Sequence, residues 1–328
     1  MPGHLVKCLL AAAFVAAGAA TAPTHAESYP GSKPITIVVP TAPGGGNDTM
    51  ARLIGQELSK RMKVPVIVDN KPGGHGIIGS QFAARAKPDG HTILFGYIGT
   101  HGINPALFPK LPYNAVKDFA PITLVAAAPG VLVVNPSVPA KTVQELAALA
   151  KSKPGALNCA SAGGGTAPHV SCEMFALQTG TQMTHVPYKG SAPAVTDTLA
   201  GHTQVMFPSL VAAQDYIKQD KLRGLAVTSK ARSPLFPSLP TMAESGLPDF
   251  EVTQWYGFFA PAKTPKEVVD RLFKEFVAIM KEPDMVKKFA EQGADVVVSS
   301  SPEEFGKFVQ ADIAKWTDLV KKANIKPE

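Results

Sequence analysis

Apolar and polar positions follow two different periods along the chain, and together they predict strands followed by helices. Residues 35–39 are apolar and mostly β-branched, as in a strand that is buried on both faces. After a short loop, apolar side chains recur at helical spacing at Met50, Leu53, Ile54 and Leu58. Further short strands are predicted at 65–69, 92–95, 157–160, 184–187, 203–207 and 222–228. Strands that alternate with helices predict βαβ units and mainly parallel sheets, which is the α/β fold class.

Two glycine-rich loops each follow a predicted strand and open a predicted helix. The first contains Gly44 to Gly46, and Asn47 and Asp48 follow as residue types that cap a helix N-terminus. The second lies within LNCASAGGGTAPHVSCEMF, residues 157–175. In such a unit the loop amides and the helix N-terminus point at one spot, which attracts an anion. We therefore expect two anion-binding loops that face each other.

Two long extended segments interrupt this alternation and predict crossings between two lobes. FAPITLVAAAPGVLVVNPSVP begins at Phe119, and EVTQWYGFFAPA begins at Glu251. Three amphipathic helices follow the second crossing and can cover the first sheet, at 265–281, 284–291 and 302–324.

The crossings divide the mature chain into two parts. We expect residues 27–126 and 251–328 to form the first lobe and residues 127–250 to form the second. Each lobe then presents one glycine loop at the C-terminal edge of its sheet. The cleft between such lobes can close on a small ligand by a hinge motion.

The N-terminal residues have the pattern of a secretory signal. A basic start with Lys7 precedes an apolar stretch from Cys8 to Ala20, and small residues lead to a predicted cut after Ala26. Residues 1–26 are therefore predicted to be a cleaved signal peptide, which places the mature protein in the periplasm.

Composition and charge exclude several classes of function. The 328 residues carry a formal net charge of +6, which fits an anionic ligand but argues only weakly for one. Lys and Arg form no stripe interleaved with aromatic residues, so nucleic acid is not an expected partner. The sequence has neither G-x-G-x-x-G nor G-x-x-x-x-G-K-[ST], which argues against a nucleotide cofactor. Since the Cys and His spacings match no zinc site, we expect no cofactor and no metal.

Several side chains near the predicted loops are candidates for ligand contacts. Tyr97, Thr100 and His101 follow the strand at 92–95, at the strand end where ligands of open α/β sheets bind, although local capping explains them equally well. Asp197 lies in a short predicted helix and has the same two readings. Cys159 and Cys172 flank the second loop, and either a disulfide or two buried thiols fits their positions.

Particular segments of the chain resemble the substrate-binding proteins of tripartite tricarboxylate transporters, the Bug receptors. The segments are YPGSKPITIVVPTAPGGGNDTMARLIGQELSKRM, VIVDNKPGGHGIIGS, AKPDGHTILFG, NPALFPKLPYNAVKDFAPIT, HVPYKGSAPAVTDTLAGHTQVMF, LRGLAVTS, RSPLFPSLPTMAESGLPDFE and WYGFFAPAKTP. The resemblance implies a two-lobe periplasmic-binding-protein-like (Venus flytrap) fold and a monomer. It also implies a receptor, not an enzyme, that delivers a small mono-, di- or tricarboxylic or aromatic acid to a membrane permease, or else serves a sensory role.

The resemblance also implies which residues hold the ligand, largely through backbone amides and water. In the first loop the matching positions are Ala42, Pro43, Gly44, Gly45 and Asp48. In the second loop they are Ser161, Gly164, Gly165, Thr166 and His169. Where the family often has Asp after the strand TQVMF, this chain has Pro208, which favours plain carboxylic acids over amino acids.

Other readings of these residues remain open. Asp48 is also a helix-capping type, Ser161 is also a loop-capping type, and His169 also suits a helix surface. An exported hydrolase or lyase acting on a carboxylate is the rival function. It would need an acid–base pair, and the sequence around Ser161 lacks the G-x-S-x-G motif.

Overall fold

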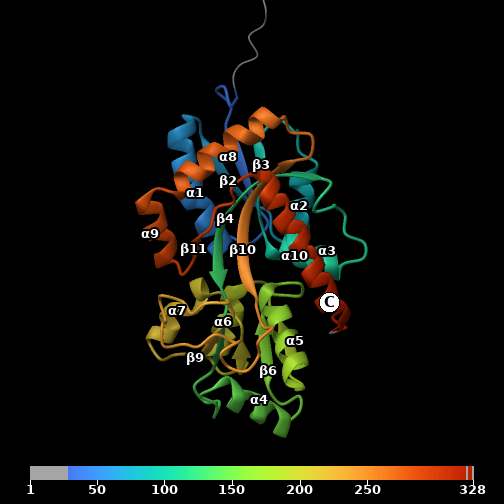
Figure 1. Ribbon diagram of the computed structural model, residues 1–328, viewed down its shortest axis with the longest axis vertical. Helices are drawn as coiled ribbons and strands as arrows, with labels where there is room; N and C mark the ends of the chain where they lie inside the picture. Colours follow the sequence, from blue (N-terminus) through green and yellow to red (C-terminus); the bar gives the residue numbers. More distant parts are fainter. Residues whose placement is uncertain (1–28, 323, 327–328) are drawn as a thin grey trace, which may run out of the picture.

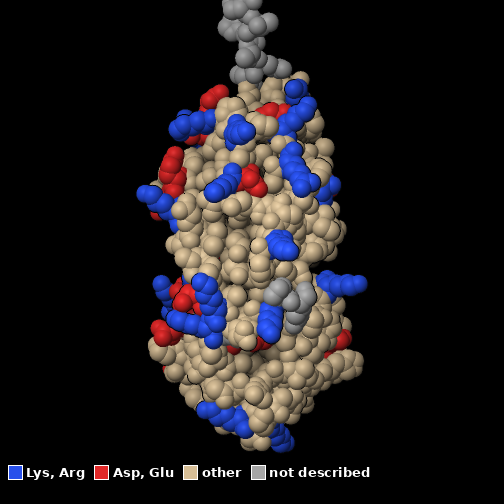
Figure 2. Space-filling view, turned by 90° about the vertical axis from the view of Figure 1, so that its right-hand side faces the viewer, with Lys and Arg blue, Asp and Glu red and all other residues tan. Residues whose placement is uncertain are grey.

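The computed structural model describes residues 29–322 and 324–326 and shows two bodies, each built on its own β-sheet (Figure 1). The predicted signal peptide at 1–26 lies outside the described residues. Charged side chains of both signs lie over both bodies on the face seen in Figure 2. Among the described helices, none combines the length and apolar character needed to cross a bilayer.

The first sheet has six strands: β1 (Ile35–Val39), β2 (Val66–Asn70), β3 (Thr92–Tyr97), β4 (Phe119–Pro129), β10 (Thr253–Pro261) and β11 (Asp295–Val296). Their order is β11–β4–β10–β3–β1–β2. β1 pairs in parallel with β2 and β3, whereas β10 pairs antiparallel with β3 and β4. Ile35, Ile37, Val38 and Val39 are fully buried, as the apolar run predicts.

Helices cover this sheet: α1 (Gly46–Met62), η1 (Gly74–Gly76), α2 (Ile77–Ala84), η2 (Gly99–Ile103), α3 (Asn104–Leu107), α8 (Lys266–Met280), α9 (Pro283–Glu291) and α10 (Pro302–Lys322). Phe276 of α8 stacks on Phe258 of β10 with ring centroids 3.9 Å apart. Phe305 of α10 meets Trp255 of β10 edge-on at 5.9 Å. The apolar stripes of the C-terminal helices thus complete the first core, as their periodicity predicts.

The second sheet has five strands: β5 (Val131–Val134), β6 (Asn158–Ser161), β7 (Thr184–Pro187), β8 (Val205–Met206) and β9 (Arg223–Val227). Their order is β7–β6–β8–β5–β9. The helices of this body are α4 (Val143–Ser152), α5 (Ala167–Thr179), α6 (Ser191–Leu199) and α7 (Leu210–Lys218). β6 pairs in parallel with β7 and β8, and the second glycine loop follows β6.

The structure confirms the α/β class with two sheets and corrects two details. Each sheet is mixed, because the crossing strands β4, β5 and β10 run antiparallel to their neighbours. The N-cap of α1 is Gly45, so the prediction of a cap at Asn47 or Asp48 is wrong. Asp48 lies inside the first turn, where its side chain folds back to the loop N–H of Gly44.

Thr228 joins the two chain crossings where the bodies meet. Its hydroxyl accepts the Gly130 N–H at 2.9 Å and donates to the Val252 carbonyl. Its own N–H donates to Gly130 O at 2.9 Å, and its carbonyl accepts the Val252 N–H at 3.0 Å. Gly130 follows β4 and Val252 precedes β10, so one buried residue couples both connections between the sheets.

Replacing the Thr228 hydroxyl should destabilise this junction. In Thr228→Val the buried Gly130 N–H and Val252 carbonyl each lose a partner, which should lower the free energy of unfolding by about 2 kcal/mol. Denaturant unfolding measures the change. Thr228→Ser keeps the hydroxyl and should remain closer to wild type; equal stability of Thr228→Val and wild type would contradict the role given to the hydroxyl.

Candidate functional site

The first glycine loop, residues 41–45, connects β1 to α1 at the edge where the parallel strands of the first sheet end. Four predicted ligand-binding positions in this loop are solvent-exposed: Ala42, Pro43, Gly44 and Gly45. The Gly44 N–H donates to Asp48 Oδ2 at 2.9 Å, which fixes the loop from the helix side.

Asp48 is buried and forms an ion pair with Arg52, with Nε 3.0 Å from Oδ2 and Nη2 2.9 Å from Oδ1. Arg52 also donates to Asn70 Oδ1 at 2.9 Å, and Asn70 Nδ2 donates to Thr41 O at 3.2 Å. Burial acts to raise the pKa of Asp48, but hydrogen bonds from Arg52 and Gly44 outweigh it and hold the pKa below its ordinary value. An ionised Asp48 therefore holds the first loop in place by accepting the Gly44 N–H.

The second glycine loop connects β6 to α5 and is held by side chains beneath it. Ser161 Oγ accepts the Gly163 N–H at 3.1 Å and lies 2.6 Å from His185 Nε2. The Gly165 N–H donates to His169 Nδ1 at 3.1 Å. The two imidazole rings stack with centroids 4.1 Å apart and planes 16° apart. Two histidines therefore support the loop from its buried side.

The remaining predicted residues of the second loop close its turn. Thr166 Oγ1 donates to Gly163 O at 2.6 Å, and Thr166 is also the N-cap of α5. Gly164 and Gly165 are buried, unlike the exposed glycines of the first loop. The second loop is therefore the more enclosed of the two.

His185 is a residue of the second loop's support that was not predicted from the sequence. It lies 24 residues from Ser161, and only the parallel pairing of β7 with β6 brings the two side chains together. A polar residue in a short strand beside a functional loop is the one feature that would have pointed to it.

A disulfide between Cys159 and Cys172 links β6 to α5 across the second loop, which resolves the choice that the sequence left open. The two Cα atoms are 6.3 Å apart, and both side chains are buried. The covalent link joins the strand and the helix whose ends define the loop.

The two loops lie where the bodies touch. A Cβ added to Gly165 would be 2.9 Å from Asn104 Oδ1 and 3.3 Å from Leu107, both in α3 of the first body. A Cβ on Gly163 would be 3.8 Å from His75 Nδ1 in η1. On the first loop's side, a Cβ on Gly46 would be 3.4 Å from Val211 of α7. The second loop thus packs directly against the first body.

Tyr97, Thr100 and His101 are buried at the end of β3 and bind one another. Thr100 Oγ1 donates to Tyr97 O at 3.1 Å and lies 2.9 Å from His101 Nδ1. His101 stacks on Phe259 at 4.0 Å, and burial lowers its pKa to about 3. Thr100 and His101 thus make local side-chain contacts, and Tyr97 binds Thr100 through its main-chain N–H and carbonyl.

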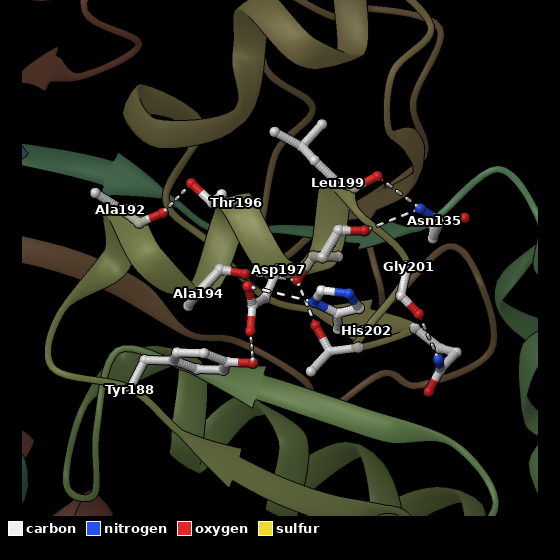
Figure 3. Close-up of polar contacts among 12 residues, drawn as sticks. Asn135, Tyr188, Ala192, Ala194, Thr196, Asp197, Leu199, Gly201 and His202 are labelled. Atoms are coloured by element: carbon white, nitrogen blue, oxygen red, sulfur yellow. Dashed lines mark hydrogen bonds and ion pairs between the residues drawn. The ribbon is translucent and has the colours of Figure 1, made fainter.

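Asp197 of α6 faces its own body in Figure 3. The Tyr188 hydroxyl donates to Asp197 Oδ2 at 2.7 Å, and His202 Nδ1 lies 3.6 Å from Asp197 Oδ1. Asp197 therefore has two partners within the second body.

The chain has two α/β bodies joined by two crossings, and each body presents one strand–loop–helix unit at the contact between them. This arrangement defines a two-lobe solute-binding protein. Residues 50–325 match the family model described as "Tripartite tricarboxylate transporter family receptor". BugT of Bordetella pertussis is 34% identical over 314 residues, which cover 95% of this chain and 96% of BugT. The chain belongs to the tripartite tricarboxylate transporter receptor family.

Solved structures agree with this assignment. The structure of R. palustris Rpa4515 with adipate has a TM-score of 0.87 and 34% identity, and covers 92% of this chain and 100% of its own. MatC (Rpa3494) from Rhodopseudomonas palustris with bound malate has a TM-score of 0.82 and 35% identity, and covers 87% of this chain and 98% of its own. The matching family model describes a transporter receptor, and the two solved structures contain adipate and malate.

The pH dependence of stability should report the ionised Asp48. Because its folded-state pKa lies below the ordinary value of about 3.9, its charge stabilises the fold above about pH 4, and this contribution is lost as pH falls through the folded pKa. Asp48→Asn should therefore unfold more easily than wild type at pH 6, and the difference should shrink below pH 4. Denaturant unfolding at both pH values measures this; a difference that does not change with pH would contradict it.

Removing the disulfide should destabilise the fold. The two cysteines are 13 residues apart, and a loop of about 15 residues gains about 3 kcal/mol from closure by a disulfide. The double variant Cys159→Ser, Cys172→Ser should lose roughly this amount in denaturant unfolding. Reduced wild type is the matched control and should resemble the variant. If the double variant and the reduced protein are both as stable as oxidised wild type, the disulfide contributes little to stability.

Proposed function

We propose that this receptor binds a small carboxylate between its two glycine loops. The observation that carries the proposal is the pair of strand–loop–helix units whose loops lie at the contact between the two bodies. Neither loop contains Lys or Arg, so main-chain N–H groups and helix N-termini supply the contacts to the anion. The adipate and malate in structures of two similar proteins support a carboxylate as the ligand class.

We assign the ligand contacts chiefly to the loops. In the first loop, residues 42–45 are exposed toward solvent and Asp48 positions them. In the second, the N–H groups of Gly165 and Thr166 already donate to His169 Nδ1 and Gly163 O, so we assign the main-chain contact to Gly164 at the tip of the turn, which Ser161 and His169 position. Thr100 and Asp197 support the surrounding structure, since the side chain of each has a protein partner, and Tyr97 holds Thr100 through its main-chain N–H and carbonyl.

We further propose how the receptor works in the cell. Residues 1–26 direct export to the periplasm and are removed. The two lobes, with boundaries near residues 126 and 250, close on the ligand as a monomer. The closed receptor then delivers the acid to the membrane permease of a tripartite tricarboxylate transporter. In this scheme the receptor binds its ligand and leaves it chemically unchanged.

One contact favours a second candidate function, hydrolysis. Ser161 Oγ lies 2.6 Å from His185 Nε2, within reach for a base that activates a hydroxyl nucleophile. Against this, Ser161 has no exposed surface in this arrangement of the bodies. Incubation with a p-nitrophenyl ester decides between the two: a receptor releases no nitrophenol above background, and release that Ser161→Ala abolishes would establish the hydrolase.

A binding experiment with a matched pair of glycine variants tests the proposal. Gly165 and Gly180 both have left-handed backbone, at φ +69° and +62°, but only Gly165 lies in the loop, and a Cβ at Gly180 meets nothing within 4 Å. Wild type should gain about 2.7 kcal/mol of stability at a hundredfold excess of a binding acid over its dissociation constant. Adipate and malate are the first probes, in thermal-shift and calorimetric titrations.

Gly165→Ala should lose at least tenfold in affinity because its Cβ would press against Asn104. Gly180→Ala should cost stability alone, by about 1 kcal/mol, and keep the wild-type affinity. Equal affinity in the two variants would place the ligand elsewhere.

A further inference from the structure

Two stacked imidazoles lie directly beneath the second glycine loop, and each contributes one ring nitrogen to it. His169 Nδ1 accepts the Gly165 N–H at 3.1 Å, and His185 Nε2 contacts Ser161 Oγ at 2.6 Å. Ser161 Oγ in turn accepts the Gly163 N–H. His169 is 3% exposed, so the loop bond is shielded from water.

The hydrogen bond from Gly165 defines the protonation state of His169. A ring nitrogen accepts an N–H only through its lone pair, so Nδ1 carries no proton while this bond exists. The proton of neutral His169 is then on Nε2, on the side of Glu173, whose Oε1 is 4.0 Å away. Protonation of Nδ1 would set two N–H donors against each other and break the bond.

The Gly165 peptide cannot adjust freely to such a change. Its φ is +69°, and even a Cβ added to it would be within 3.4 Å of Asn104, Leu107 and Phe108 of the first body. Loss of the His169 acceptor therefore disturbs the loop at the point where the two bodies meet.

Other titratable groups near His169 come from three elements. Glu173 on α5 favours a positive imidazole at His169, and His185 on β7 stacks on the His169 ring. His75 of η1 faces Gly163 from the first body. All of them modulate how readily His169 gains charge, but the added proton still has to enter at Nδ1.

We propose that His169 is a positioning residue for the second loop and that a proton on its Nδ1 dismantles the loop and weakens ligand binding. The proposal deepens the carboxylate site described above and rests on it for its ligand readout. An unperturbed imidazole changes charge between about pH 5 and 8, so the test compares binding near the two ends of that range.

Titrations of adipate and malate at pH 8 and pH 5.5 test the proposal. Wild type should bind at least about tenfold more weakly at the lower pH. In His169→Asn, Oδ1 takes the place of Nδ1 as acceptor and cannot gain a proton, so affinity should be kept and should no longer depend on pH. His169→Leu removes the acceptor and should bind weakly at both pH values.

His91→Asn is the matched control. His91 precedes β3 and contacts Pro34 O at the opposite end of the strands from the loops. This variant should keep the wild-type pH dependence. If His169→Asn keeps it too, the proposal is overturned.

A ligand-free measurement separates this proposal from the choice of ligand. In ¹⁵N-labelled protein at pH 8, His169 should show the tautomer protonated on Nε2, and the Gly165 amide should be protected from hydrogen exchange. Both signals should change together on acidification. An Nδ1-protonated His169 at pH 8, or Gly165 protection that does not vary with pH, overturns the proposal even if neither acid binds.

Discussion

Main-chain N–H groups can hold an anion only if their peptides already point at it before the anion arrives. In this receptor, side chains behind each loop hold the loop backbone in shape. Asp48 accepts the Gly44 N–H and His169 accepts the Gly165 N–H, so these two groups point at protein acceptors, and other N–H groups of the loops are the ones proposed to meet the anion. Neither loop needs a cationic side chain to be ready for an anion, because helix N-termini and peptide dipoles supply the positive potential.

The two sheets serve to bring these loops together. Strands β4 and β10 lead from one body to the other, and Thr228 links the crossings that extend from them. The loops meet the opposite body through glycines, whose backbone lies close to side chains such as Asn104, Leu107 and Val211. In the proposed function, a ligand enclosed there is read by shape and by peptide groups, which suits the different acids, adipate and malate, found in structures of two similar proteins.

The sequence predicted the features that depend on local order. The β-branched run at 35–39 and the glycines after it predicted a strand, a loop and a helix, and these are present. Features that depend on pairing between distant segments escaped prediction. The antiparallel course of β10 and the position of His185 follow from strand register, and the pairing of Cys159 with Cys172 follows from the angle between β6 and α5.

A crystal structure of the protein with adipate or malate, whichever stabilises it more, tests the central claim most directly. A carboxylate group of the ligand should lie within about 3 Å of main-chain N–H groups from both glycine loops. The peptides of Gly44 and Gly165 should keep the orientations they have without ligand. A ligand held instead by Lys or Arg side chains, or bound to one loop alone, would contradict the account.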